Sequence, residues 1–231
     1  MYRSLFFDLD DTLWAFTINA RDTLHELYDT HLYNRFFLSF DHFYAIYQKR
    51  NLELWEQYAR GEVDKTQLNH LRFLYPLQAV GAEDADLASR FASDFFDILP
   101  TKTRLVPHTV ELLDYLSEKG YRLYILSNGF RELQARKMQS AGISHYFRRI
   151  VLSEDIGLLK PHPEIFHFAL SATQSEATTS LMVGDSWESD VTGARNAGIA
   201  QVYYNPERTT TPHSFAPTYE VTDLRELASI L

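Results

Sequence analysis

The stretch Ser4–Leu13 reads Ser-Leu-Phe-Phe-Asp-Leu-Asp-Asp-Thr-Leu, an apolar run followed at once by three carboxylates and a hydroxyl. The short apolar run predicts a buried β-strand. Asp8 and Asp10 lie two residues apart and project to the same side wherever the backbone stays extended. In open α/β sheets, ligands bind beyond the carboxyl ends of the strands. We therefore expect Asp8 and Asp10 to share one ligand, although a strand ending in a solvated acidic turn would give the same pattern.

The composition indicates a globular protein with a sizeable core. The chain has 231 residues, 45% of them hydrophobic and 14% aromatic, which fits one large domain or a core with an insertion. Its formal net charge of −9 argues against partners such as polymeric nucleic acid or an anionic membrane, while a local site could still hold one small anion. Cysteine is absent, so disulfides and thiol chemistry are excluded. With neither a signal-like nor a membrane-spanning run, we expect a cytoplasmic protein.

The chain has two regions that differ in their sequence pattern. From residue 14 to residue 99, helix-compatible stretches follow one another with few prolines or glycines. We expect four helices there, of which the first is capped by Asn19 and the third ends before Pro76. From Pro100 onward, short apolar runs alternate with helical patterns, as in βα units around a parallel sheet. The expected fold class is therefore α/β, with a helical block inserted after the first strand.

Polar residues occupy the ends of several expected strands. Ser127 ends one strand pattern, Asp185 follows another, and Lys160 lies in a loop between them. Together with Asp8 and Asp10, these side chains should meet at one edge of the sheet. Carboxylates from two strands with a main-chain oxygen form a hard-oxygen site suited to Mg²⁺, against which a phosphoryl group would bind. The cofactor expected from this pattern is therefore Mg²⁺.

A phosphate beside carboxylates needs positive charge and hydrogen-bond donors. The Ser127 hydroxyl, the Lys160 ammonium and backbone N–H groups around Asn128 would supply them. Each residue also has an ordinary explanation: Ser127 as a turn residue, Lys160 as an exposed charge and Asp185 as a helix cap. Their joint occurrence at matching strand ends favours the phosphoryl-binding interpretation.

These motifs resemble those of the haloacid dehalogenase superfamily of phosphatases. Asp8-Leu9-Asp10-Asp11-Thr12 is similar to the first motif of that family, Ser127 to the second, Lys160 to the third, and the segment from Gly184 to Asp190 to the fourth. The resemblance implies a Rossmann-like parallel-sheet core with helices on both faces, formed by residues 1–13 and 104–231. Residues 14–103 would form an inserted α-helical cap domain that includes its hinges.

The resemblance also implies roles for individual residues. Mg²⁺ would be held by Asp8, the carbonyl of Asp10 and Asp185, and Asp190 would support that set of ligands. Asp8 would be the nucleophile that forms an aspartyl phosphate. Asp10 would protonate the leaving alkoxide and then deprotonate the attacking water.

A narrower resemblance concerns the noncanonical pyrimidine 5'-nucleotidases. It is carried by Ser127-Asn128-Gly129-Phe130 with Leu133-Gln134, and by Ala216-Pro217-Thr218-Tyr219. It implies a small phosphorylated metabolite as partner, namely a pyrimidine (deoxy)nucleoside monophosphate. Trp14, Phe16 and Phe130 are then candidates for contact with the base, because stacking contributes ~1 to 3 kcal/mol per base. The same rings could instead pack the cap against the core.

Several alternatives stay open at this point. A sugar-phosphate phosphatase or a phosphomutase of the same superfamily would use the same motif residues. A dehalogenase would share the nucleophile but needs neither a metal nor an acid for a halide, so Asp10 and Asp185 argue against it. A receiver-like phosphoryl switch needs a long-lived phosphoaspartate, whereas Asp10 is placed to activate water, and the large helical insertion fits it poorly. The oligomeric state cannot be predicted from this pattern.

Overall fold

The computed structural model describes residues 1–210 and 214–231, which divide into two compact units. Unit 1 comprises Met1–Phe16 and Thr103–Leu231, and unit 2 comprises Thr17–Lys102. Unit 2 is thus inserted between the first strand of unit 1 and the rest of that unit. It occupies the part of the chain in which the sequence predicts the helical block.

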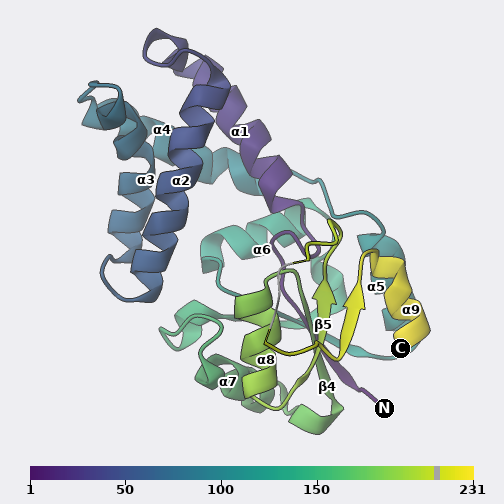
Figure 1. Ribbon diagram of the computed structural model, residues 1–231. Coiled ribbons are helices and arrows are strands. Elements are labelled where there is room, and N and C mark those ends of the chain that lie inside the picture. Colours follow the sequence, from purple (N-terminus) through teal and green to yellow (C-terminus); the bar gives the residue numbers. More distant parts are fainter. Residues whose placement is uncertain (211–213) are drawn as a thin grey trace. The chain divides into compact units, whose positions relative to one another are not determined.

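Unit 1 is built on a six-stranded parallel sheet, which confirms the predicted α/β fold class (Figure 1). The strands in chain order are β1 (Ser4–Phe7), β2 (Arg122–Ser127), β3 (Phe147–Leu152), β4 (Ser180–Gly184), β5 (Ala200–Tyr204) and β6 (Tyr219–Val221). Their spatial order is β3-β2-β1-β4-β5-β6, so β1 lies between β2 and β4. All four residues of β1 are buried, as expected of a central strand covered on both faces.

Helices cover both faces of this sheet. They are α5 (Thr109–Glu118), α6 (Arg131–Ser140), α7 (Pro163–Thr173), α8 (Gly193–Asn196) and α9 (Leu227–Ile230). The crossovers through α5 and α6 run in one direction along the sheet and those through α7 and α8 in the other. Because parallel crossovers are right-handed, the two pairs lie on opposite faces (Figure 1). On one face Phe6 and Met182 belong to the same buried cluster as Phe166 of α7 and Ala194 of α8.

The end of β1 lies where the connections change direction: from β1 they run to β2 and β3 on one side, and the later ones run to β4 and β5 on the other. Phe7 of β1 is in register with Ile125 of β2 on one side and with Val183 of β4 on the other. In open α/β sheets, this topological switch point is where ligands bind. The residues that follow β1 and β4, Asp8 and Asp185, therefore begin the loops at this point.

Unit 2 is helical. Its helices are α1 (Phe16–Thr30), which begins at the last residue of unit 1, α2 (Phe40–Ala59), α3 (Lys65–Ala79) and α4 (Ala85–Ile98). Aromatic side chains fill its interior: the ring centroid of the fully buried Phe91 lies 4.6 Å from that of Tyr33, 5.8 Å from that of Phe43 and 5.5 Å from that of Phe73. Such pairs add to the free energy gained from area burial alone.

Two predicted helix limits in this part of the chain are wrong. The first helix begins at Phe16, and Asn19 is buried within it instead of capping it. The third helix passes through Pro76 and ends at Ala79. Proline lacks the N–H donor of a regular turn, but Phe73, Pro76 and Leu77 are all buried, and this packing offsets the missing hydrogen bond.

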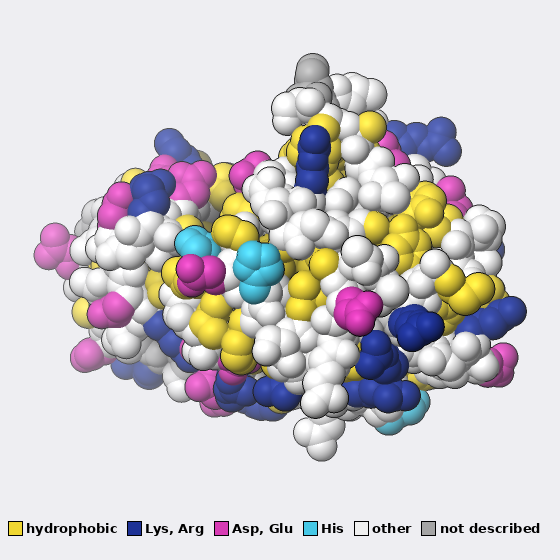
Figure 2. All heavy atoms as spheres, turned by 90° about the horizontal axis from the view of Figure 1, so that it is seen from below, with side chains coloured by type: hydrophobic (Ala, Val, Ile, Leu, Met, Phe, Trp, Pro, Cys, Tyr) yellow, Lys and Arg dark blue, Asp and Glu magenta, His cyan; other side chains and the backbone are white. Residues whose placement is uncertain are grey.

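Although the chain as a whole is acidic, part of its surface carries clustered basic side chains. Figure 2 shows Lys and Arg side chains close together on one face, although the formal net charge is −9. Acidic side chains lie among hydrophobic and uncharged groups on the same face. In the described part of the chain, no helix combines the length and the apolar character needed to cross a membrane.

Candidate active site

Lys160 connects the end of β1 with the segment that follows β4. Its Nζ lies 2.7 Å from Asp8 Oδ1 and 2.6 Å from Asp190 Oδ1, and it donates to the carbonyl of Leu126 at 2.8 Å. These contacts use the three donor positions of the ammonium. The Lys160 side chain is only 2% exposed, so the predicted exposed-charge alternative does not describe it.

Asn128 fixes the backbone from which Lys160 projects. Its Oδ1 accepts a hydrogen bond of 2.7 Å from the Lys160 backbone N–H, and its Nδ2 donates to the Lys160 carbonyl at 3.0 Å. The amide is therefore committed at both ends to the Lys160 main chain. An amide nitrogen carries two hydrogens, so a phosphate could still accept from the second Nδ2 hydrogen or from the Asn128 backbone N–H.

Thr12 links the acidic loop after β1 to the start of the loop after β4. Its hydroxyl donates to Asp185 Oδ1 at 2.7 Å and accepts from the Asp185 backbone N–H at 3.1 Å. This reciprocal pair brings Asp185 to the same edge of the sheet as Asp8. Thr12 is fully buried, so the link is shielded from competing water.

Asp190 is positioned by an irregular helix. The segment after Ser186 is not one regular α-helix, because Trp187–Thr192 (η6) is a π-helix followed by the short α8. Single π-helical turns often occur at functional sites. Within this turn, Asp190 Oδ2 accepts a hydrogen bond of 3.1 Å from the Ser186 backbone N–H. Gly184 lies against this carboxylate, and a β-carbon at position 184 would overlap it.

The carboxylates of Asp8, Asp185 and Asp190 fit a divalent cation. One oxygen of each lies within 4.8 Å of the others. Both Asp190 oxygens are engaged, by Lys160 and by the Ser186 N–H, so Asp8 and Asp185 are better placed to ligate directly. Three carboxylates beside one ammonium leave excess negative charge, and carboxylate oxygens are the ligands that Mg²⁺ prefers.

The pKa shifts of these groups also fit a bound divalent cation. Burial raises the pKa of Asp185 to about 7, and the carboxylate of Asp190 raises it in the same direction. Burial also raises the pKa of Asp8 well above its usual value, against the opposing effect of Lys160. Burial would lower the pKa of Lys160, but Asp190 and Asp8 outweigh it, so the net pKa is raised. A divalent cation would favour the ionised form of both carboxyls.

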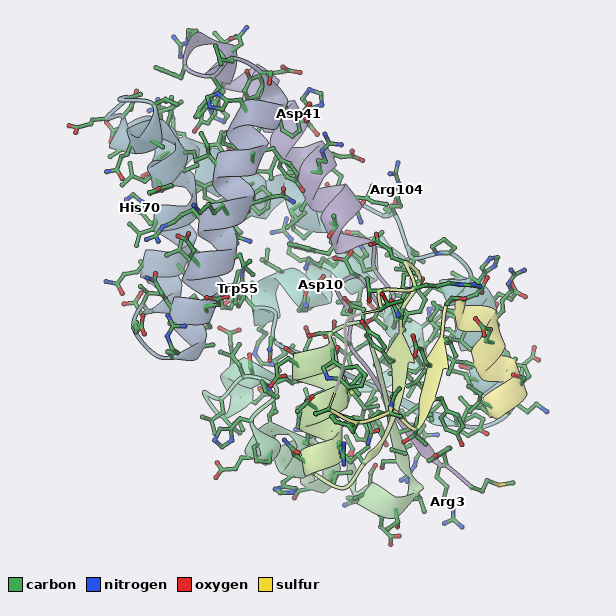
Figure 3. The ribbon with its side chains drawn as sticks, viewed as in Figure 1. Arg3, Asp10, Asp41, Trp55, His70 and Arg104 are labelled. Carbon is green, nitrogen blue, oxygen red and sulfur yellow. The ribbon has the colours of Figure 1, made fainter. Side chains whose placement is uncertain are left out.

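Asp10 lies at the same edge of the sheet (Figure 3), but its carboxylate is held by α6. Lys137 Nζ lies 2.7 and 3.0 Å from the two Asp10 oxygens, and Gln134 Nε2 donates to Asp10 Oδ2 at 3.0 Å. Gln134 Nε2 also donates to Ser127 Oγ at 2.8 Å. The carboxylate of Asp10 is therefore held by side chains of α6 and is not part of the cluster of Asp8, Asp185 and Asp190.

Gln134 and Lys137 were not among the predicted site residues. Gln134 entered only through a family resemblance, and Lys137 carried no motif. The signal that could have found them is their spacing of three on the helix that follows Ser127, which puts both side chains on one helix face. Both are almost completely buried, which is rare for lysine unless it is paired.

The three aromatic candidates for base contact differ in exposure. Trp14 is completely buried, with its ring centroid 4.7 Å from Lys137 Nζ. Phe130, which precedes α6, is 3% exposed. Phe16 is half-buried, with its ring centroid 5.0 Å from the same Nζ. In this structure Phe16 is thus the candidate with appreciable accessible surface.

Fold and site together define a class of α/β protein in which acidic loops after two central parallel strands meet one buried lysine. Residues 2–198 match the haloacid dehalogenase-like hydrolases, and the chain belongs to that family. A curated relative, the pyrimidine 5'-nucleotidase YjjG of Escherichia coli (strain K12), is 33% identical over 98% of this chain and 96% of its own.

Two further comparisons widen this view. The glyceraldehyde 3-phosphate phosphatase of Methanothermobacter thermautotrophicus is 30% identical over 90% of this chain and 88% of its own. The orthorhombic crystal structure of Bacillus subtilis YfnB bound to magnesium superposes with a TM-score of 0.87 and 28% identity, covering 99% of this chain and 98% of that one. The fold resemblance therefore extends over the whole chain, while the nucleotidase and the triose-phosphate phosphatase among the relatives act on different phosphorylated compounds.

Proposed function

We propose that the protein is a Mg²⁺-dependent phosphomonoester hydrolase that works through an aspartyl phosphate on Asp8. The observation that carries this proposal is the position of Asp8 at the switch point of the sheet, with Lys160 at 2.7 Å and Asp185 in the same carboxylate cluster. Phosphatases among the relatives support the same class of reaction.

In the first step an Asp8 oxygen attacks phosphorus, and the bond from phosphorus to the substrate oxygen breaks. Asp10 donates a proton to the leaving alkoxide. In the second step Asp10 takes a proton from water, the water oxygen attacks phosphorus, and the bond from phosphorus to Asp8 breaks to release phosphate. A carboxylate is a competent covalent nucleophile, and an acid beside it helps most where the leaving group is poor.

The phosphoryl oxygens need donors and positive charge throughout. Ser127 Oγ accepts hydrogen bonds from Gln134 Nε2 and the Gly129 N–H, which leaves its own proton to donate to a phosphoryl oxygen. Lys160 adds a fixed positive charge beside Asp8. Mg²⁺ held by Asp8, Asp185 and the Asp10 carbonyl would reduce the repulsion between the nucleophile and the phosphate.

The nucleophile assignment is tested with Asp8→Asn. We expect phosphate release from a phosphomonoester to fall to background, while Asp29→Asn, an exposed aspartate, keeps wild-type activity. Mass spectrometry of the purified variant should confirm that the amide has not hydrolysed. Wild-type turnover by a variant that still carries the amide would reject Asp8 as the nucleophile.

For the substrate we propose nucleoside 5'-monophosphates, with pyrimidine deoxynucleotides first. The support is the nucleotidase relative and the accessible ring of Phe16, since base stacking on aromatic rings is worth ~1 to 3 kcal/mol. The second candidate is a sugar-phosphate phosphatase, which the triose-phosphate relative favours.

Values of kcat/KM for dUMP, dTMP, AMP and a set of triose and hexose phosphates distinguish these candidates. We expect a pyrimidine nucleotide to lead. A sugar phosphate preferred by tenfold, or about 1.4 kcal/mol of transition-state discrimination, would overturn the nucleotidase assignment and leave the phosphatase mechanism intact. A phosphomutase would return an isomeric phosphomonoester instead of inorganic phosphate.

A further inference from the structure

Lys137 is a buried lysine whose charge is directed at the carboxylate of Asp10. It lies in α6, its side chain is 3% exposed, and its Nζ contacts both Asp10 oxygens, at 2.7 and 3.0 Å. Taking an ammonium out of water is costly unless it is paired and hydrogen-bonded. The buried ammonium therefore favours the one orientation of the Asp10 carboxylate in which both oxygens contact it.

Aromatic rings from the segment that carries Asp10 lie close to the same ammonium. The ring centroids of Trp14 and Phe16 lie 4.7 and 5.0 Å from Lys137 Nζ, within the range of cation–π attraction. The Trp14 carbonyl accepts a hydrogen bond of 2.8 Å from the Asp11 N–H, so the rings are tied to the loop after β1. One short segment thus supplies both the carboxylate and the rings around Lys137.

Gln134, one helical turn before Lys137, joins Asp10 to the expected phosphate-binding hydroxyl. Its Nε2 donates to Asp10 Oδ2 at 3.0 Å and to Ser127 Oγ at 2.8 Å. Gly129 makes room for this side chain, because a β-carbon at position 129 would overlap it. The carboxylate and the hydroxyl are therefore held by the same amide, at a fixed separation.

We propose that Lys137 and Gln134 are positioning residues that hold the Asp10 carboxylate for proton transfer to the leaving group. The proposal rests on the proposed phosphatase function and assigns a role to two residues outside the predicted motifs. An ordinary buried ion pair would stabilise unit 1 without affecting one chemical step more than another. A positioning role predicts a selective effect on the step in which the proton is donated.

The test compares two leaving groups in the full chain with Mg²⁺. The value of kcat/KM reports the steps up to loss of the leaving group. An alkyl phosphate needs a proton from Asp10, whereas p-nitrophenyl phosphate does not, because p-nitrophenolate leaves readily as an anion. General acid catalysis typically contributes 10²–10⁴-fold, so we expect Lys137→Met to lower kcat/KM for the alkyl phosphate by about 10²-fold and for p-nitrophenyl phosphate by less than about threefold.

Companion variants make the result specific. Asp10→Asn should reproduce the selective loss, and adding Lys137→Met to it should cause no further selective loss. Lys137→Arg, which keeps the charge, should recover most of the alkyl-phosphate activity. Lys119→Met removes an exposed lysine and should leave both substrates unaffected. Gln134→Met, of similar volume, should shift the ratio in the same direction, and it provides a second measurement if Lys137→Met does not fold.

Three results would overturn the proposal. The first is an equal loss on both substrates, which would describe a structural role, and the second is no loss on either substrate. The third is a crystal structure of Lys137→Met or Gln134→Met with the Asp10 carboxylate in its original orientation. If the wild-type protein hydrolyses neither phosphomonoester, the proposed function fails, and the orientation of Asp10 in those crystals still decides the positioning role.

Discussion

Lys160 Nζ lies 2.6 Å from Asp190 Oδ1, and the two side chains are 2% and 1% exposed. A charged pair this deeply buried is tolerated only when its remaining hydrogen bonds are satisfied. Asp190 meets this condition through the Ser186 N–H, and Lys160 through the carbonyl of Leu126 and the carboxylate of Asp8. The stability of unit 1 is therefore coupled to the groups that we assign to phosphoryl transfer.

Lys160→Met should destabilise the metal-free protein by about 3–5 kcal/mol, because Asp8 and Asp190 would be left as buried carboxylates without their cation. The free energy of unfolding in urea measures this loss. Adding Asp190→Asn should restore part of it, and the exposed Lys119→Met serves as the matched control. A loss no larger than that of the control would show that the pair carries no net stabilisation.

Asp185→Asn should abolish the stabilisation that Mg²⁺ gives to the folded protein. A ligand at a hundred times its dissociation constant stabilises by about 2.7 kcal/mol, and replacing a carboxylate by an amide removes both a strong ligand and a charge. The measurement is the shift of Tm on addition of Mg²⁺, with Asp29→Asn as control. An unchanged shift in Asp185→Asn would remove Asp185 from the metal site.

Phe91→Ala should destabilise unit 2 by about 3–5 kcal/mol, because it opens a cavity among the aromatic rings of that unit. Leu52→Ala is the control, since Leu52 is 64% exposed. Hydrogen exchange measured at increasing urea concentration would show whether the loss of stability is confined to residues 17–102. A uniform loss across both units would indicate that they unfold together.

Asp223→Asn should weaken the start of the last helical segment, and the effect should disappear in acid. Hydrogen bonds from the Arg225 side chain and backbone lower the pKa of Asp223 to about 2, below its unfolded value. Its contribution to stability is therefore present above about pH 4 and is lost as the pH falls toward 2. Loss of such a cap costs about 0.5–2 kcal/mol. The difference in unfolding free energy between wild type and variant should be the same at pH 7 and 5, smaller at pH 3 and smallest at pH 2, and a difference that stays constant down to pH 2 would contradict this.

Much of the fold and the meeting of the motif residues could be predicted from local patterns. The strand of Ser4–Phe7, its acidic continuation and the polar residues after later strands suffice, because parallel strands end at one edge of a sheet. Asp8, Lys160 and Asp185 consequently lie where the sequence expects them, and their catalytic roles remain predictions.

What the sequence could not predict depends on packing between segments distant in the chain. The contact of Lys137 with Asp10 spans 127 residues and is set by how α6 packs beside the loop after β1. The π-helical turn at Trp187–Thr192 arises where Asp190 turns back to Lys160. Pro76 stays within a helix because burial offsets its missing donor, a balance that local propensity does not contain.

The central place of β1 in the sheet has a consequence for biosynthesis. Its partners β2 and β4 are synthesised long after it, and Thr12 reaches Asp185 across 173 residues. During translation, β1 therefore has neither of its partner strands, and its N–H and C=O groups stay unpaired until unit 2 and then β2 have been synthesised. Contacts this distant in sequence form slowly, and unpaired strands are prone to aggregate. Unit 2, whose helices rely on local contacts, can fold first and keep the nascent chain compact until the sheet closes around β1.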